Sequence, residues 1–149
     1  MKEDYASYDL AVALKAAGFD WKCNDGYSVK LRLEPEPSFG APKTAHSNAP
    51  KNFNDNRKGG ADGREFYSAP LLSQAQKWLR EKKKIDVLVY NCACGYLWEV
   101  SKAINGTRLI LFDEKGDDEN SGCWTTYEGA ISAGISAALE LLAGKEGEG

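Results

Sequence analysis

The sequence predicts an α+β fold in which an antiparallel β-meander packs with three helices. Residues 85–113 contain short runs of β-branched and aromatic residues separated by two turn sequences, which is typical of three consecutive antiparallel strands. Asn105 and Gly106 suit a two-residue hairpin turn, because both tolerate positive φ. Residues 93–95 suit a three-residue turn with Gly95 in the left-handed position. We expect about five strands, in the order helix, strand, long loop, strand, helix, three strands, helix.

The first helix and the first strand each have a clear pattern. Ser7 can cap the start of a helix of about three turns, and Gly18 can end it in the left-handed conformation. The residues on its apolar face are Leu10, Ala13, Leu14 and Ala17. Residues 27–33 alternate between apolar and polar side chains, which predicts a strand with one solvated face.

Residues 34–63 differ in composition from the rest of the chain. They are rich in Pro, Gly, Asn, Asp, Lys and Ala, and their only large apolar side chains are Phe39 and Phe53. Such a segment buries too little apolar surface to offset its ordering entropy. We therefore expect a long mobile loop at about 34–63, inserted between two strands, with regular structure resuming at 64–68.

Two further helices are predicted on either side of the meander. Pro70 suits the first turn of the second helix, and the basic residues 80–84 near its end complement the helix dipole. Residues 125–128 form a capping box for the last helix, which Gly144 ends. We expect one domain over 1–144 and a frayed tail over 145–149. The apolar positions of these two helices are Leu72, Ala75, Trp78 and Leu79, then Ile131, Ile135, Ala138, Leu139 and Leu142.

Charge and cysteine content limit the classes of function. The 149 residues carry a net charge of −3, from 19 basic and 22 acidic side chains, which does not favour a protein specialised in binding phosphate backbones. The first twenty residues do not resemble a signal peptide, and no segment is long and apolar enough to span a bilayer. Four cysteines are few for a disulfide scaffold, so we expect free thiols and a cytoplasmic location.

The four cysteines do not predict a metal site. Cys23, Cys92, Cys94 and Cys123 could in principle supply four thiolates for zinc, but one residue between Cys92 and Cys94 is a shorter spacing than zinc sites use. A catalytic thiol needs a nearby base, and the single histidine, His46, lies in the expected loop. We therefore expect no metal, no cofactor and no catalytic residue.

An acidic cluster and a basic cluster are both expected to be solvated segments. The acidic residues after the meander lack the spacing of a calcium loop and do not fix a pair of catalytic carboxylates, so a solvated connection is favoured. They are Asp113, Glu114, Asp117, Asp118 and Glu119. The basic and aromatic residues of the expected loop suit single-stranded nucleic acid, although acidic neighbours dilute their charge. They are Phe39, Lys43, Lys51, Phe53, Arg57, Lys58 and Arg64.

Aromatic residues suggest a binding surface. In the central strand of the meander Tyr96, Trp98 and Val100 share one face, and Leu97 and Glu99 share the other. Periodicity alone leaves open which face is buried. Most of the tryptophans and tyrosines are expected in the core or at its rim, and a minority exposed on the open sheet face would form a protein-binding patch. The four tryptophans are Trp21, Trp78, Trp98 and Trp124.

Four segments together carry a resemblance: YDLAVALKAAGFD, SAPLLSQAQKWLREKK, CGYLWEV and the long run from FDEKGDD to AALELL. They resemble a family of small uncharacterised proteins from gut Bacteroidetes, their phages and their mobile elements. The resemblance implies the same order of helices and strands and a cytosolic setting, but no activity and no catalytic residue. Leu71 stands where the family shows Thr, which makes Ser68 the expected cap of the second helix. The stretch 34–63 is longer than in the family.

The sequence therefore predicts a small cytoplasmic accessory protein, encoded by a mobile element, that binds another protein. The expected contact residues are Tyr96, Trp98 and Trp124. The alternative is a nucleic-acid-binding regulator that uses the basic loop with Lys82, Lys83 and Lys84. A small enzyme is the third hypothesis, with a cleft near Cys92, Cys94 and the acidic loop. Neither the partner nor the oligomeric state follows from the sequence.

Overall fold

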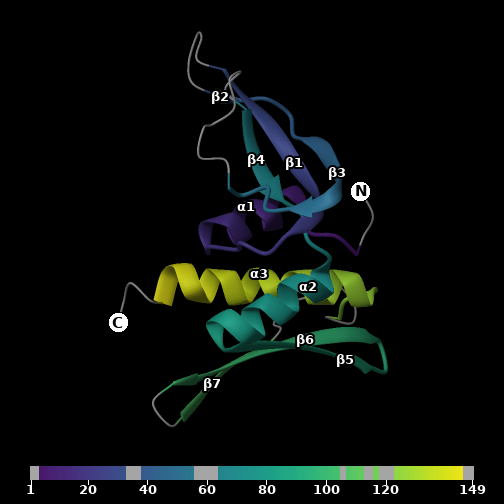
Figure 1. Cartoon of the computed structure of the whole chain (residues 1–149). Coiled ribbons are helices and arrows are strands. Elements are labelled where there is room, and N and C mark those ends of the chain that lie inside the picture. Colours follow the sequence, from purple (N-terminus) through teal and green to yellow (C-terminus); the bar gives the residue numbers. More distant parts are fainter. Residues whose placement is uncertain are drawn as a thin grey trace. The chain divides into compact units, whose positions relative to one another are not determined.

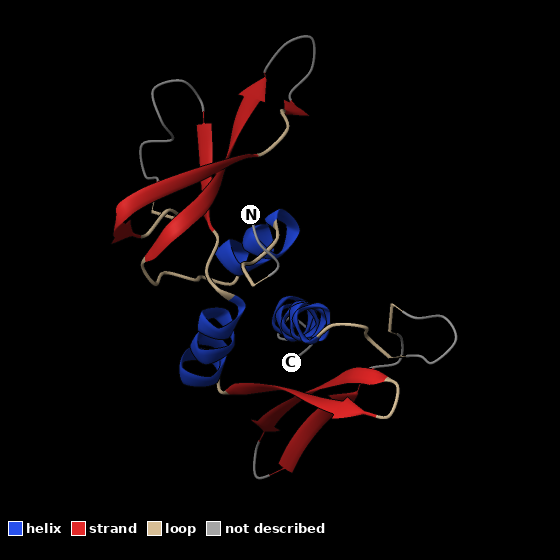
Figure 2. Cartoon of the chain, turned by 90° about the vertical axis from the view of Figure 1, so that its right-hand side faces the viewer, coloured by secondary structure: helices blue, strands red, loops and turns tan. Residues whose placement is uncertain are grey.

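The computed structural model describes residues 4–32, 38–55, 64–104, 107–112, 116–117 and 123–145. The fold is α+β with antiparallel sheets, as predicted (Figures 1 and 2). The chain divides into two compact units, Met1–Leu71 and Leu72–Gly149, where one domain was expected. Each unit contains its own sheet and its own buried side chains.

The first unit is built around one long strand. Its described elements are α1 (Tyr8–Ala16), β1 (Cys23–Arg32), β2 (Ser38–Phe39), β3 (Lys43–Lys51) and β4 (Arg64–Ser68). All three other strands pair antiparallel with β1. Gly26 is opposite Ala45 on one side and Ser68 on the other, so β3 and β4 flank β1.

Both ends of α1 confirm the sequence prediction. The Ser7 hydroxyl accepts a hydrogen bond from the Leu10 amide at 3.3 Å, which satisfies one of the free N–H groups of the first turn. At the other end Gly18 has a φ of +97°. Its amide bonds to the Lys15 carbonyl, and the next amide, of Phe19, bonds to the Leu14 carbonyl, both at 3.0 Å. This is a Schellman motif, which glycine permits because it has no Cβ.

The expected long loop contains structure, which corrects the prediction for 34–63. Both β2 and β3 lie in it, and Phe53 is 4% exposed. The β3 side chains are mostly exposed and show no apolar alternation. Backbone pairing with β1 therefore orders this strand, helped by the burial of Phe53, and neither contribution appears in a hydrophobic pattern. Residues 33–37 and 56–63 lie outside the described part of the chain.

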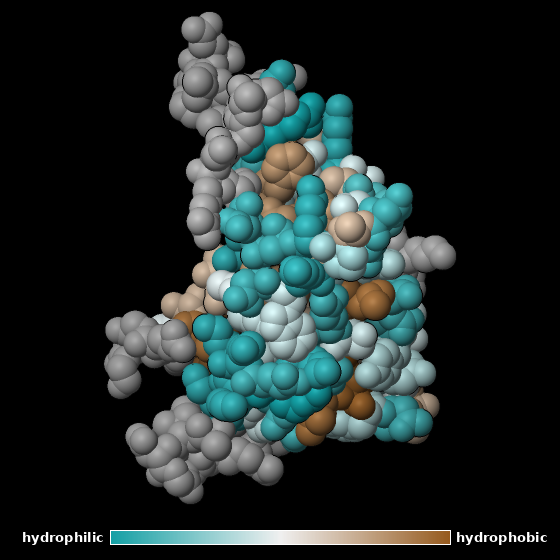
Figure 3. All heavy atoms as spheres, in the orientation of Figure 1, coloured by the Kyte–Doolittle hydropathy of each residue, from teal (hydrophilic) through white to brown (hydrophobic). Residues whose placement is uncertain are grey.

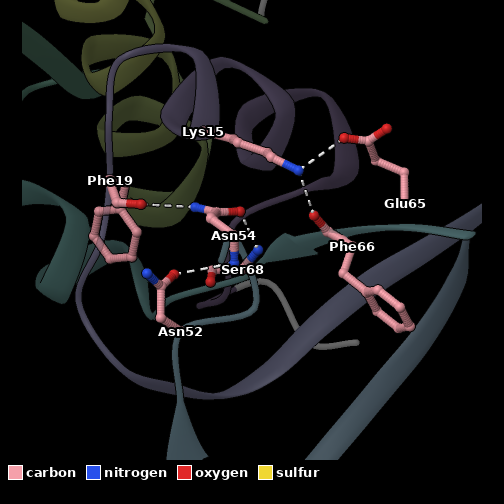
Figure 4. A network of polar contacts seen from close by, with 7 residues as sticks. All are labelled: Lys15, Phe19, Asn52, Asn54, Glu65, Phe66 and Ser68. Atoms are coloured by element: carbon pink, nitrogen blue, oxygen red, sulfur yellow. Dashed lines mark hydrogen bonds and ion pairs between the residues drawn. The ribbon is translucent and has the colours of Figure 1, made fainter. Parts of the chain in front are cut away.

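A small polar network ties the loop after β3 to its surroundings (Figure 4). The Asn54 side chain donates to the Phe19 carbonyl at 2.8 Å and accepts from the Ser68 amide at 2.9 Å. The Lys15 ammonium donates to the Glu65 carboxylate at 2.9 Å and to the Phe66 carbonyl at 3.0 Å. Three of these four bonds satisfy backbone groups, namely the Phe19 and Phe66 carbonyls and the Ser68 amide.

The second unit consists of a three-stranded meander and its helices. Its described elements are α2 (Leu72–Trp78), the π-helical turn η1 (Leu79–Lys83), β5 (Ile85–Cys92), β6 (Gly95–Ile104), β7 (Thr107–Phe112) and α3 (Tyr127–Lys145). The strand order is β5-β6-β7, which confirms the predicted meander. Ser68 ends β4, so it does not cap α2, which begins at Leu72.

The two turns of the meander are both short. Cys92 is opposite Gly95, so the first turn has two residues where three were expected, and Gly95 has a positive φ of +149°. Ile104 is opposite Thr107, which agrees with the expected two-residue turn. Its residues, Asn105 and Gly106, lie outside the described part of the chain.

Helix α3 decides which face of the meander is covered (Figure 2). A Cβ on Gly134 would lie 2.8 Å from a Val87 methyl group and 3.1 Å from the Trp98 Cβ. The face with Val87 and Trp98 therefore lies under the helix, and glycine allows the close approach. The predicted capping box is shifted by one residue, because Thr126 Oγ1 accepts from the Gly129 amide at 3.0 Å. The helix continues to Lys145, one residue beyond the expected end.

No described helix is both long enough and apolar enough to cross a membrane.

Candidate functional site: the open sheet face and a group of three sulfurs

The face of the meander opposite α3 exposes large apolar side chains. Leu88 is 49% exposed and Tyr90 is 45% exposed. Both point away from α3, because side chains alternate along β5 and Val87 faces the helix. Leu97 is opposite Tyr90 on β6 and is half-buried. Glu99, opposite Leu88, lies on the same face. We call Leu88, Tyr90, Leu97 and Glu99 the open face.

Beyond Val87, the outer edge of β5 carries backbone groups that no described residue pairs. The Tyr96 amide and carbonyl bond to Trp124, both at 2.8 Å, so they point away from β5. Directly opposed residues of an antiparallel pair orient these groups in opposite directions, so the amide and carbonyl of Asn91 point to the outer edge. Because this orientation alternates along the strand, the amide and carbonyl groups of Val89 and Val87 also point to the outer edge. The Gln76 side chain donates to the Val87 carbonyl at 2.6 Å, which covers the start of this edge.

The three aromatic residues predicted to bind a partner lie on the other side of the sheet. Tyr96, Trp98 and Trp124 are all half-buried. The Tyr96 ring meets the Tyr127 ring edge to face, with centroids 6.0 Å apart. The Trp124 ring lies against Gly129 in the first turn of α3. These rings therefore fill the layer between the sheet and the helix, and the open face is formed by different residues.

The three predicted basic residues end the second helix. Lys83 lies over the Trp78 ring, with its ammonium 5.6 Å from the centroid. Lys84 has a φ of +59°, and its ammonium donates to the Glu81 carbonyl at 3.1 Å. Lys82 is exposed. Two of the three lysines thus make contacts that close the helix end, as the dipole argument predicts.

Three sulfurs meet at the tip of the first hairpin. Cys94 and Cys123 form a disulfide with their Cα atoms 6.3 Å apart, where the sequence predicted free thiols. The Cys92 Sγ lies 3.1 Å from the Cys123 Sγ and 3.4 Å from the Cys94 Sγ. Cys92 is not disulfide-bonded. We call these three residues the sulfur cluster.

The bridge between Trp124 and Tyr96 brings the third cysteine to this tip. Cys92 directly precedes the two-residue turn and Cys94 lies in it, and Cys123 directly precedes Trp124. A side chain on Gly95 would collide with the Trp124 carbonyl, so the approach requires glycine at this position. The sequence spacing gave no indication of this arrangement, because Cys123 is 29 residues from Cys94. The signal in the sequence is the glycine next to Cys94 in a turn, because glycine allows another chain segment to approach closely.

Cys23 belongs to the first unit and has a different environment. It is 4% exposed, and its thiol donates to the Trp21 carbonyl at 3.6 Å. Burial raises the pKa of the Cys23 thiol to about 11. Since the thiolate is the reactive and metal-binding form, Cys23 is an inert core residue at neutral pH.

His46 lies on β3 and makes an ion pair within the first unit. Its Nδ1 is 2.8 Å from an Asp25 carboxylate oxygen, and its Nε2 is 3.2 Å from the Asn48 side-chain oxygen. The hydrogen bond to Asp25 raises the pKa of His46 above 6.5. No described cysteine lies in this group.

We expect a proton NMR titration of the single histidine to give a pKa above 6.5, and Asp25→Asn to lower that pKa. Because the folded state favours the protonated imidazole, its contribution to stability is present below pH 6.5. That contribution is lost as the pH rises through the raised pKa. A wild-type pKa at or below 6.5, or one unchanged by Asp25→Asn, would contradict this expectation.

The remaining charged candidates do not converge in the described part of the chain. Asp117 accepts hydrogen bonds from the Thr125 amide at 2.8 Å and hydroxyl at 3.0 Å, which supports the approach to α3. The ammonium of Lys51 lies 4.7 Å from the centroid of the Phe53 ring. Six other candidates lie outside the described residues: Arg57, Lys58, Asp113, Glu114, Asp118 and Glu119.

Comparison with models of protein families, with curated proteins and with solved structures gave no match. The resemblance to the gut Bacteroidetes family stays a prediction.

Proposed function

We propose that this chain is a cytoplasmic accessory protein, encoded by a mobile element, that binds another protein along β5. The observation that carries the proposal is the pair of exposed apolar side chains, Leu88 and Tyr90, beside the outward backbone groups of Val89 and Asn91, which no described residue pairs. Exposed apolar and aromatic side chains contribute most to the free energy of binding when a partner removes them from water.

The strand edge indicates how a partner would bind. An extended segment can pair with the outward amide and carbonyl groups of Val89 and Asn91, which adds a strand to the sheet. Alternate side chains of that segment would then lie over Leu88 and Tyr90. The visible side chains in Figure 3 are largely hydrophilic, with apolar groups in small separate patches.

The experiment places a photo-reactive amino acid at Tyr90 and, as a matched control, at the exposed Glu140 of α3. We expect irradiation in the native cells to give a discrete cross-linked protein from position 90 and not from position 140. Leu88→Lys should reduce the yield at least about tenfold, because a buried charge at a contact centre costs more than 1.4 kcal/mol.

Leu88 is half exposed, so lysine at this position is tolerated by the fold. The same adducts from positions 90 and 140 would contradict the proposal. So would a cross-linking yield that Leu88→Lys leaves unchanged. Cross-linking to nucleic acid from position 90 would favour the alternative regulator.

A further inference from the structure

We propose that the reduced sulfur cluster is a three-thiolate binding site for Zn²⁺. This inference does not depend on the proposed protein-binding function. It rests on the convergence of Cys92, Cys94 and Cys123, whose sulfurs all lie within 4.8 Å of one another. Thiolates are the ligands that zinc prefers in structural sites, and three protein ligands with one open position are a common coordination set.

The geometry needs little change to accept the ion. A zinc–sulfur bond of about 2.3 Å places tetrahedral ligand sulfurs roughly 3.8 Å apart. The Cys92 sulfur is already 3.1 Å from the Cys123 sulfur and 3.4 Å from the Cys94 sulfur. Reduction of the disulfide lets the remaining pair separate to the same distance. Cys94 is exposed and lies in a turn, so its side chain has room to move.

The third sulfur is the feature that a disulfide alone does not explain. A crosslink between Cys94 and Cys123 needs two cysteines, and Cys92 adds a thiol in contact with both. Three thiolates at these distances repel one another, so either protons or a bound cation must neutralise them. A divalent ion with high affinity for sulfur provides that neutralisation.

Backbone pairing holds the three ligands before any metal binds. Cys92 is the last residue of β5, opposite Gly95, and Cys94 lies in the turn between them. Cys123 is held by the two hydrogen bonds between Trp124 and Tyr96. Among the described residues, no fourth cysteine, histidine or carboxylate joins the group.

The disulfide and the metal site are alternative states of the same sulfurs. In the oxidised chain two of the three ligands are bonded to each other, so the affinity for Zn²⁺ should be lost. Binding to the reduced chain should release protons, because the thiols must be deprotonated to coordinate the ion.

The test uses the full chain without a histidine tag, reduced with a phosphine and kept free of oxygen. Zn²⁺ is titrated in competition with a chromophoric chelator, and Co²⁺ serves as a spectroscopic probe for thiolate ligation. We expect one ion per chain, a sulfur-to-cobalt charge-transfer band, and no binding by the oxidised chain. Cys92→Ser should weaken the affinity at least about 100-fold, because it removes one of three ligands.

The matched control is Cys23→Ala, which removes the buried cysteine of the other unit and should leave one Zn²⁺ bound with unchanged affinity. Cys92 is outside the disulfide, so oxidised Cys92→Ser should retain the wild-type circular dichroism spectrum and show that the variant folds. Absence of Zn²⁺ binding by the reduced chain would overturn the proposal. Unchanged binding in Cys92→Ser, or binding that is lost in Cys23→Ala, would overturn it as well.

Discussion

Replacing Gly26 by alanine is expected to lower the free energy of unfolding of the first unit by roughly 3 kcal/mol. Gly26 lies in β1 where β3 and β4 pair on both sides, so the strand cannot shift away. An added Cβ would lie 2.6 Å from the Tyr67 carbonyl oxygen and 2.9 Å from a Phe53 ring carbon. The first contact is with backbone, which cannot relax by a change of rotamer.

Chemical denaturation followed by circular dichroism, with hydrogen exchange of the β1 amides, measures this loss. Gly40→Ala is the control, because its added Cβ would lie 3.6 Å from the Lys30 carbonyl, an ordinary contact. We expect that control to change the unfolding free energy by less than about 0.5 kcal/mol. Equal stability of the two variants would show that the structure around Gly26 accommodates an added methyl group, which would contradict the prediction.

Truncation of Trp78 to alanine is expected to cost about 3–5 kcal/mol in the second unit. Trp78 ends α2 and is 2% exposed, and it is among the largest fully buried side chains described. Its removal leaves a cavity that the surrounding helix and strand side chains fill only in part. The ring also supports the Lys83 ammonium at the helix end.

The control for this variant is Leu88→Ala, which removes a large apolar side chain from the open face. Since Leu88 is 49% exposed, its loss should cost less than about 1 kcal/mol. Urea denaturation monitored by tryptophan fluorescence distinguishes the two changes. A large effect of Leu88→Ala would mean that the open face is part of the core, and would also count against the proposed binding surface.

Interactions between near neighbours in the sequence, such as helix caps and tight turns, correctly predicted several helices and strands. Ser7 and Gly18 delimit α1 because a hydroxyl cap and a left-handed glycine act within one turn. The predicted strand at 64–68 coincides with β4, and the meander follows from its short turns and apolar runs. The cap of α3 was misplaced by one residue, because Thr125 bonds to Asp117 and leaves Thr126 for the helix.

Strand β3 shows why periodicity failed between residues 34 and 63. Most of its side chains are exposed, so it has no apolar face to reveal it. Its order comes from a ladder of backbone hydrogen bonds to β1, and every residue type except proline can contribute both groups to such a ladder. His46 is therefore a strand residue paired with Asp25, where the sequence suggested a loop.

The amino-acid sequence by itself determined the order of the three helices and the meander, because capping, turns and side-chain periodicity act between near neighbours. Only the tertiary structure decided which sheet face is open and which sulfurs meet. Glycine at position 134 lets α3 approach the face of Trp98, and this leaves Leu88 and Tyr90 exposed on the other. Pairing of Trp124 with Tyr96 carries Cys123 to Cys92 and Cys94. Both outcomes depend on contacts between residues far apart in the chain, which spacing along the sequence does not encode.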